Sequence, residues 1–197
     1  QATQVVFNND GTKMFIVNHA GRKSVDEYLL STAFDVSTAT FDSEIIISGQ
    51  EKRANSIAFN NDGTRMVVAG VGNSSQERIH EYSLSTGFDL SSTVTHLNTE
   101  DLISFHNHID GVIFNYDGTK MYTINGNENN ISQFKLTTPY DVSTLSLEGT
   151  YYLSSVVNNA REVVFSNDGS KMFIIDDGLD KVHEFNLSCN WSVIDGA

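Results

Sequence analysis

One phrase of eight residues occurs four times in this chain and constrains its fold more than any other feature. The copies span residues 7–14, 59–66, 114–121 and 165–172, and each joins a phenylalanine to an Asp-Gly pair, a basic residue and a methionine. Their aspartates lie 52, 55 and 51 residues apart. A regular period of this length is typical of like units that share one core. We therefore expect a single domain of four repeats, approximately residues 1–53, 54–108, 109–159 and 160–197.

Each Asp-Gly pair is flanked by apolar segments, such as 5–7 with 14–17 and 163–165 with 172–175. Glycine supplies the positive φ of a tight turn, so this pattern predicts a β-hairpin in every repeat. The turn is either a two-residue type I′ turn or a type I turn followed by a glycine bulge. Because the apolar residues are consecutive and do not alternate, both faces of these strands are expected to be buried.

A third strand of mixed character follows each hairpin, at residues 25–30, 79–84, 131–136 and 182–187. After a bend (34–37, 88–91 and 140–143), the first three repeats continue into a fourth segment at 39–48, 93–102 and 145–153. Only ten residues follow Leu187, too few for another outer strand. Four antiparallel strands with burial that falls outward describe a propeller blade. The prediction is an all-β protein, a β-propeller of four four-stranded antiparallel blades whose last blade lacks its outer strand.

Three arrangements of four blades are compatible with the sequence: a closed four-blade ring, a homodimer that pools eight blades, and a piece of a longer array. The closed ring is favoured at this stage, because an open end would expose the apolar flanks of a terminal blade. The chain starts at Gln1 without a methionine or a leader, so we expect a processed product or a piece of a longer protein.

Over nearly its whole length the repeat resembles the Asp-Gly hairpin repeats of YVTN and lactonase-like propellers. It is more similar still to repeats of uncharacterised proteins from marine bacteria and their phages. The phrase at 7–14 and the Phe-Asp-Val-Ser-Thr phrase at 34–38 carry this resemblance. Both phrases are structural, so the resemblance implies the fold and transfers no activity.

Composition excludes several classes of partner. With 25 acidic and 12 basic residues, a net charge of −13 and a pI near 4.6, the chain would repel nucleic acid. The charges are scattered, which indicates a solubilising surface. No apolar run approaches the roughly 20 residues that a membrane-spanning helix needs, so no membrane insertion is expected. Cys189 is the single cysteine, which excludes an intramolecular disulfide.

The loops that differ between repeats are the candidates for function, since the identical turns are explained by backbone geometry. They link the second strand to the third, and each repeat to the next, and they should surround one mouth of the central channel. The candidate ligand-binding residues in them are Asn18, His19, Arg53, His106, His108, Asp110, Asn127, Arg161 and Asp176.

No catalytic, metal or cofactor site is predicted from these residues. His106, His108 and Asp110 are a reasonable ligand set for a metal, but His-Asn-His in a polar loop is more often solvated. Asp176, Asp177 and Asp180 lack the spacing of an EF-hand calcium loop. A Gly-x-Ser-x-Gly elbow is also absent from the sequence.

The sequence favours a non-enzymatic propeller module that presents its variable loops to a macromolecule or glycan. Such a module would belong to a larger surface, secreted or virion protein, outside the cell or on a cell or virion surface, and a homodimer is possible. The alternative is a lactonase-like or other hydrolase with a metal or a His/carboxylate site at the channel mouth. A spacer without any ligand is the third hypothesis.

Overall fold

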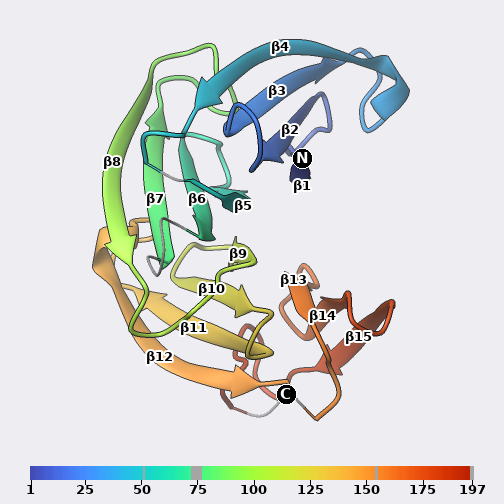
Figure 1. The fold of residues 1–197 in the computed structure, drawn as a ribbon, viewed down its shortest axis with the longest axis vertical. Helices are drawn as coiled ribbons and strands as arrows, with labels where there is room; N and C mark the ends of the chain where they lie inside the picture. Colours follow the sequence, from blue (N-terminus) through green and yellow to red (C-terminus); the bar gives the residue numbers. More distant parts are fainter. Residues whose placement is uncertain (51, 72–76, 154, 196–197) are drawn as a thin grey trace.

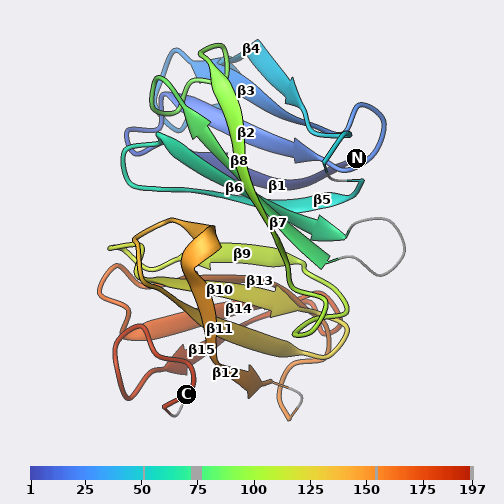
Figure 2. The same cartoon turned by 90° about the vertical axis from the view of Figure 1, so that its left-hand side faces the viewer.

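The computed structural model describes residues 1–50, 52–71, 77–153 and 155–195, and within them the chain is almost entirely β-structure. Four antiparallel sheets stand around one central axis as the blades of a propeller (Figure 1). Seen from the side, the sheets lie one beside the next along the arc (Figure 2). No helix in the described residues is long and apolar enough to cross a membrane.

Blades 1 to 3 have four strands each, and blade 4 has three, which confirms the predicted fold class. In every blade the strands follow chain order from the axis outward. Blade 1 contains β1 (Ala2–Phe7), β2 (Lys13–Asn18), β3 (Ser24–Leu30) and β4 (Ala39–Ile46). Blade 2 contains β5 (Ala54–Phe59), β6 (Arg65–Val71), β7 (Glu77–Leu84) and β8 (Val94–Asp101). Blade 3 contains β9 (Gly111–Phe114), β10 (Lys120–Asn125), β11 (Asn130–Leu136) and β12 (Leu145–Tyr152). Blade 4 contains β13 (Ala160–Phe165), β14 (Lys171–Asp176) and β15 (Lys181–Asn186). Two short 3-10 helices, η1 (Val36–Thr38) and η2 (Val142–Thr144), lead into the outer strands of blades 1 and 3.

The Asp-Gly turns have the second of the two geometries that the sequence left open. In blade 1 the Gly11 N–H donates to the Asn8 carbonyl at 3.2 Å, and Gly11 has a φ of 72°. This is a type I turn followed by a glycine in the left-handed region. The Asp10 carboxylate accepts hydrogen bonds from the backbone N–H and the hydroxyl of Thr12. The Asp and Gly that recur in all four repeats are therefore used by the turn itself.

An aromatic residue from the bend after the third strand covers each of these turns. Its backbone N–H donates to the carbonyl of the turn glycine, as in the 2.9 Å bond from Phe34 to Gly11. The equivalent residues in the other blades are Phe88, Tyr140 and Trp191. Trp191 shows that blade 4 keeps the bend although it lacks the outer strand. The sequence analysis missed this bend because Trp191-Ser192-Val193 has a tryptophan and a serine where blade 1 has Phe34 and Asp35.

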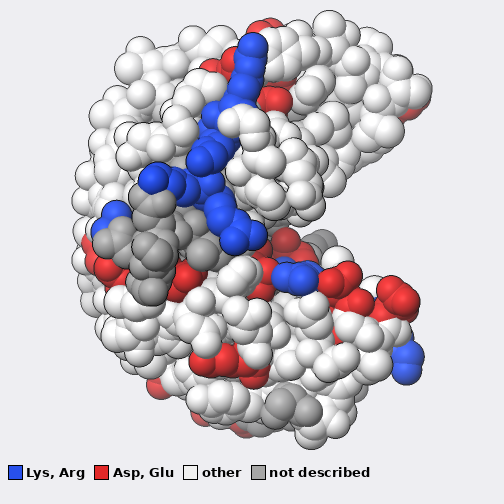
Figure 3. Space-filling model, in the orientation of Figure 1, with Lys and Arg blue, Asp and Glu red and all other residues white. Residues whose placement is uncertain are grey.

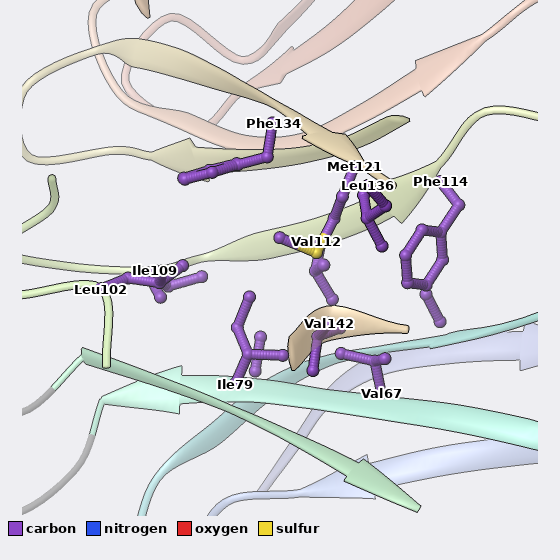
Figure 4. Close-up of a cluster of buried hydrophobic side chains, with 12 residues drawn as sticks. Val67, Ile79, Leu102, Ile109, Val112, Phe114, Met121, Phe134, Leu136 and Val142 are labelled. Atoms are coloured by element: carbon purple, nitrogen blue, oxygen red, sulfur yellow. The ribbon is translucent and has the colours of Figure 1, made fainter. Parts of the chain in front are cut away.

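Three hydrophobic clusters hold the blades together, and each lies at a junction between neighbours. The first joins blades 1 and 2, the second joins blades 2 and 3, and the third joins blades 3 and 4 (Figure 4 shows the second). Among the described residues, no such cluster joins blade 4 to blade 1. The space-filling view shows a hollow that opens between these two blades (Figure 3). The four sheets stand in one ring, and the junction between blades 4 and 1 differs from the other three by this hollow.

Candidate functional site

The inner strands β1, β5, β9 and β13 line a central cavity of 1370 Å³. Polar and apolar side chains contribute to its wall. Five of the nine candidate residues from the sequence lie on this cavity: His19, Arg53, His108 and Asp110 in links, and Arg161 on the strand β13, not in the link where the sequence placed it. The structure thus brings together residues as far apart in the chain as His19 and Arg161.

Asp110 is the centre of a polar network that joins blades 3 and 4 at the channel mouth. Its carboxylate accepts a hydrogen bond from the Gly126 N–H at 2.8 Å and from the Arg161 guanidinium at 3.0 Å. His108 Nδ1 lies 3.0 Å from Oδ2, the oxygen that also accepts from Gly126, whereas Arg161 binds Oδ1. Burial raises the pKa of Asp110. The hydrogen bond from His108, the charge of His108 and the hydrogen bonds from Gly126 and Arg161 together outweigh burial, so the pKa is lowered overall. Asp110 is therefore ionised at neutral pH.

Arg161 extends this network to the loop after β14. Its Nη2 donates to Asp177 at 3.2 Å, while its Nη1 is bound to Asp110. Although burial alone lowers the pKa of Arg161, the two carboxylates raise it above its usual value. The guanidinium is fixed by planar hydrogen bonds on two sides and remains partly open to the cavity.

His108 has the orientation of a general base, because Nδ1 faces a carboxylate and Nε2 is left for another partner. Among the described residues, no serine, threonine or cysteine side chain is hydrogen-bonded to that Nε2. The pair therefore lacks the nucleophile that a Ser-His-Asp arrangement requires.

His106 points away from the cavity, into the junction between blades 2 and 3. It is 2% exposed, and its Nε2 lies 2.5 Å from the Thr123 hydroxyl. Burial lowers its pKa to about 4, so the ring is neutral at pH 7. The histidine is separated from the Asp110 network, and in the described parts of the chain no three His, Cys, Asp or Glu residues are placed to hold a metal ion. The set of His106, His108 and Asp110 is thus not assembled as a metal centre.

Asp176 also serves the scaffold. At the end of β14, its carboxylate accepts backbone N–H bonds from Asn158, Asn159 and Gly178, each at 3.0 Å, and lies 3.1 Å from His183 Nε2. Burial opposes its ionisation, but these donors outweigh burial and lower the pKa to about 2. The carboxylate fixes the link between blades 3 and 4.

Asn18 and Asn127 lie at the same end of the molecule but outside the cavity wall. Asn18, at the end of β2, donates to Asp26 on the neighbouring strand at 2.9 Å. Asn127 is exposed in the link between β10 and β11. His19 lies beside Arg53, where burial and the positive charge of Arg53 lower its pKa.

Glu162 and Gln4 are cavity residues that the sequence analysis missed. Gln4 Nε2 donates to Glu162 Oε2 at 2.9 Å, which joins β1 to β13 across the channel. Gln4 also accepts a hydrogen bond from the Ile57 N–H on β5. A signal was available: the residue three positions before each repeat phenylalanine is Gln4, Ser56, Gly111 or Glu162, which interrupts the apolar inner strand.

The raised pKa of Glu162 predicts a pH dependence of stability. Burial raises this pKa from 4.5 to about 7, so the folded state holds the proton more tightly than the unfolded state. The resulting stability is complete below pH 4.5 and is lost as the pH rises toward 7. Glu162→Gln should therefore raise the free energy of unfolding at pH 8 by about 1–3 kcal/mol and change it little at pH 4. Urea denaturation at both pH values measures this difference. Asp42→Asn, at an exposed carboxylate of β4, is the control, and equal pH slopes for all three proteins would contradict the prediction.

Charge is divided across the end of the molecule that carries the variable loops. Figure 3 shows a band of Lys and Arg over blades 1 and 2, and mostly Asp and Glu over blades 3 and 4. The basic residues at this end of blades 1 and 2 are Arg22, Lys23, Lys52 and Arg53 in the links and Arg78 at the start of β7. A net acidic chain thus presents one basic region beside its channel.

Known structures place this chain among the β-propellers. It superposes on a protein from Lactobacillus plantarum with a TM-score of 0.64 and 15% identity, covering 94% of this chain and 51% of that one. A candidate 6-phosphogluconolactonase from Bacteroides fragilis gives a TM-score of 0.60 and 12% identity, with 94% and 50% covered. For a second such protein, from Bacteroides uniformis, the values are 0.59 and 18%, with 91% and 51% covered. Likeness at this level of identity shows the fold alone.

The chain spans about half the length of the solved structures that it matches. No protein-family model matches it, and no curated protein matches it in sequence.

Proposed function

We propose that this chain is a binding module whose variable loops and channel mouth contact a macromolecule or a glycan. The observation that carries the proposal is the Asp110 network, in which His108 and Arg161 are held in place by scaffold bonds and face the cavity. Prearranged polar groups of this kind recognise a ligand without the entropic cost of ordering their side chains.

The size of the cavity supports an extended ligand. Its 1370 Å³ exceeds the roughly 300–1,000 Å³ of ordinary small-molecule pockets. A segment of a polymer, such as an oligosaccharide or a peptide loop, would fill such a channel mouth better than a metabolite. The basic links of blades 1 and 2 favour acidic groups on that ligand, because they lie beside the cavity.

The proposed setting is a larger surface, secreted or virion protein. Two observations support it: the resemblance of the repeats to those of marine bacteria and phages, and an acidic composition suited to salty surroundings. The half-length match to known propellers fits a module that is completed by other parts.

A glycan array that includes neutral, carboxylated and sulfated oligosaccharides tests the proposal, with a peptide array alongside. We expect a defined set of acidic hits, and we expect Arg161→Ala to weaken binding about tenfold, which corresponds to about 1.4 kcal/mol. Lys135→Ala is the control, because Lys135 is an exposed basic residue of β11 that does not line the cavity or belong to the basic links. Absence of hits on both arrays, or equal affinities for both variants, would contradict the proposal.

A lactonase-like hydrolase is the second candidate. It is favoured by the His108–Asp110 pair and by the likeness to structures described as candidate 6-phosphogluconolactonases. Hydrolysis of a phosphorylated gluconolactone that is lost in His108→Ala and kept in His96→Ala would support this candidate. Equal hydrolysis by both variants and by buffer would exclude it for this substrate.

A further inference from the structure

The outer faces of blades 1 and 4 carry the kinds of residue that are buried at the three internal junctions, but here these residues are exposed. At each internal junction an inner-strand residue of the following blade is buried: Ile57 is 1% exposed, Val112 2% and Val163 0%. The residue at the same position of blade 1 is Val5, which is 52% exposed. Blade 1 thus offers an apolar position that the other three blades cover with their neighbour.

Blade 4 shows the opposite half of the same junction. Val182 on β15 is 67% exposed, whereas its equivalents Val25, Ile79 and Ile131 are fully buried against the next blade. Ile175 on β14 is likewise exposed, although the equivalent Val17 and Ile124 are buried. The face that would receive a following blade is therefore apolar and uncovered.

A polar interlock accompanies the apolar contact at each internal junction. Glu27 Oε1 lies 2.6 Å from Lys13 Nζ of its own blade, and Oε2 accepts a 2.6 Å hydrogen bond from the Leu90 N–H of the next blade. Glu81 binds Arg65 and the Val142 N–H in the same way. At the third junction the Gln133 side chain accepts from the Val193 N–H at 2.9 Å.

Blade 4 carries the acceptor of this hydrogen-bond pattern, and blade 1 carries the donor. Glu184 of blade 4 pairs through Oε1 with Lys171, in the manner of Glu27 and Glu81, and its side chain is half exposed. Val36 of blade 1 stands where Leu90 and Val142 stand, and it is 60% exposed while they are buried. Blade 4 thus offers a hydrogen-bond acceptor and exposed apolar residues, and blade 1 offers the matching donor and apolar residues at the equivalent positions.

We propose that the partner of each end face is the opposite end face of a second copy of this chain. Blade 4 of one copy packs on blade 1 of the other. Val182 then packs against the face of blade 1 that carries Val5, and Glu184 accepts a hydrogen bond from the Val36 N–H. Two-fold symmetry makes this contact twice and leaves neither face open. The proposal is independent of the ligand at the channel mouth. It also requires the ends of one chain to move apart, so the Gln4–Glu162 hydrogen bond across the channel is exchanged for contacts between copies.

Light scattering on the purified chain tests the pairing. The expected species has a mass of about 44 kDa, twice the 21.8 kDa of one copy. Val182→Asp should give a folded species of one-copy mass, because it places a carboxylate in the apolar contact. Val156→Asp, at an exposed valine in the link after β12, should keep the paired mass. Circular dichroism confirms that both variants fold. One-copy mass for the unmodified chain at all accessible concentrations, or pairing that survives Val182→Asp, overturns the proposal.

Mixing two defective copies tests the head-to-tail direction. Val5→Asp and Val182→Asp each damage both contacts of a symmetric pair, so each should remain single. A mixed pair retains one undamaged contact, between blade 4 of the Val5→Asp copy and blade 1 of the Val182→Asp copy. Pairing should therefore return in the mixture at concentrations about 100-fold above those that pair the unmodified chain, since one of two linked contacts is lost. A mixture that remains as monomeric as its components rules out this direction.

Discussion

Phe134→Ala is expected to lower the free energy of unfolding by about 3–5 kcal/mol, the largest effect of a single side chain that we predict. Phe134 lies on β11 with no exposed surface, in the cluster that joins blades 2 and 3 (Figure 4). Its ring also meets the edge of Phe105, with centroids 5.7 Å apart. Removing the ring opens a cavity between two packed sheets, which cannot collapse without moving a blade.

Urea denaturation at one fixed protein concentration measures this loss. Phe41→Ala is the matched control, because Phe41 on β4 is about half exposed, and its loss should cost less than about 1 kcal/mol. Phe134→Leu should fall between the two, since it refills part of the cavity. Similar midpoints for the Phe134→Ala and Phe41→Ala proteins would show that this cluster does not hold the blades together.

Gly63→Ala is expected to cost about 3 kcal/mol or more, for two separate reasons. Gly63 has a φ of 71°, where an added Cβ costs roughly 1–2 kcal/mol. The new Cβ would also overlap the ring and the backbone nitrogen of Phe88, which covers this turn. Such overlap forces the bend away from the turn and adds about 1–3 kcal/mol.

Gly21→Ala separates the two causes. Gly21 has a similar φ of 74°, but no atom lies within 4 Å of a Cβ built there. It should therefore lose only the conformational part, about 1–2 kcal/mol. Thermal or urea unfolding of both variants gives the comparison. Equal losses would mean that the contact between the turn and the aromatic residue contributes little.

The fold could be predicted from the sequence because its signals are local. Each Asp-Gly turn is determined by four neighbouring residues, and the Asp10 and Thr12 side chains complete it without help from another blade. The consecutive apolar residues around it require sheets that are covered on both faces. Repetition at a period of just over fifty residues then predicts stacked, equivalent sheets.

The candidate site was less predictable, because a sequence places a residue in a loop but does not say where its side chain points. His106 and His108 are two residues apart, yet one is buried against Thr123 and the other faces Asp110 at the cavity. Asp176 was a candidate ligand residue, but three backbone N–H groups occupy its carboxylate. The direction of each side chain depends on neighbours from another blade.

By itself the sequence determined the blade, the position of its Asp-Gly turn and the number of repeats, since these depend on contacts within about fifty residues. Tertiary structure alone decided that Asp110 meets Arg161, that Glu27 reaches Leu90, and that the faces of blades 1 and 4 remain uncovered. The physical reason is that each such contact joins equivalent positions of different repeats. Its formation depends on the angle and distance between whole sheets, which the packing of the three junctions sets.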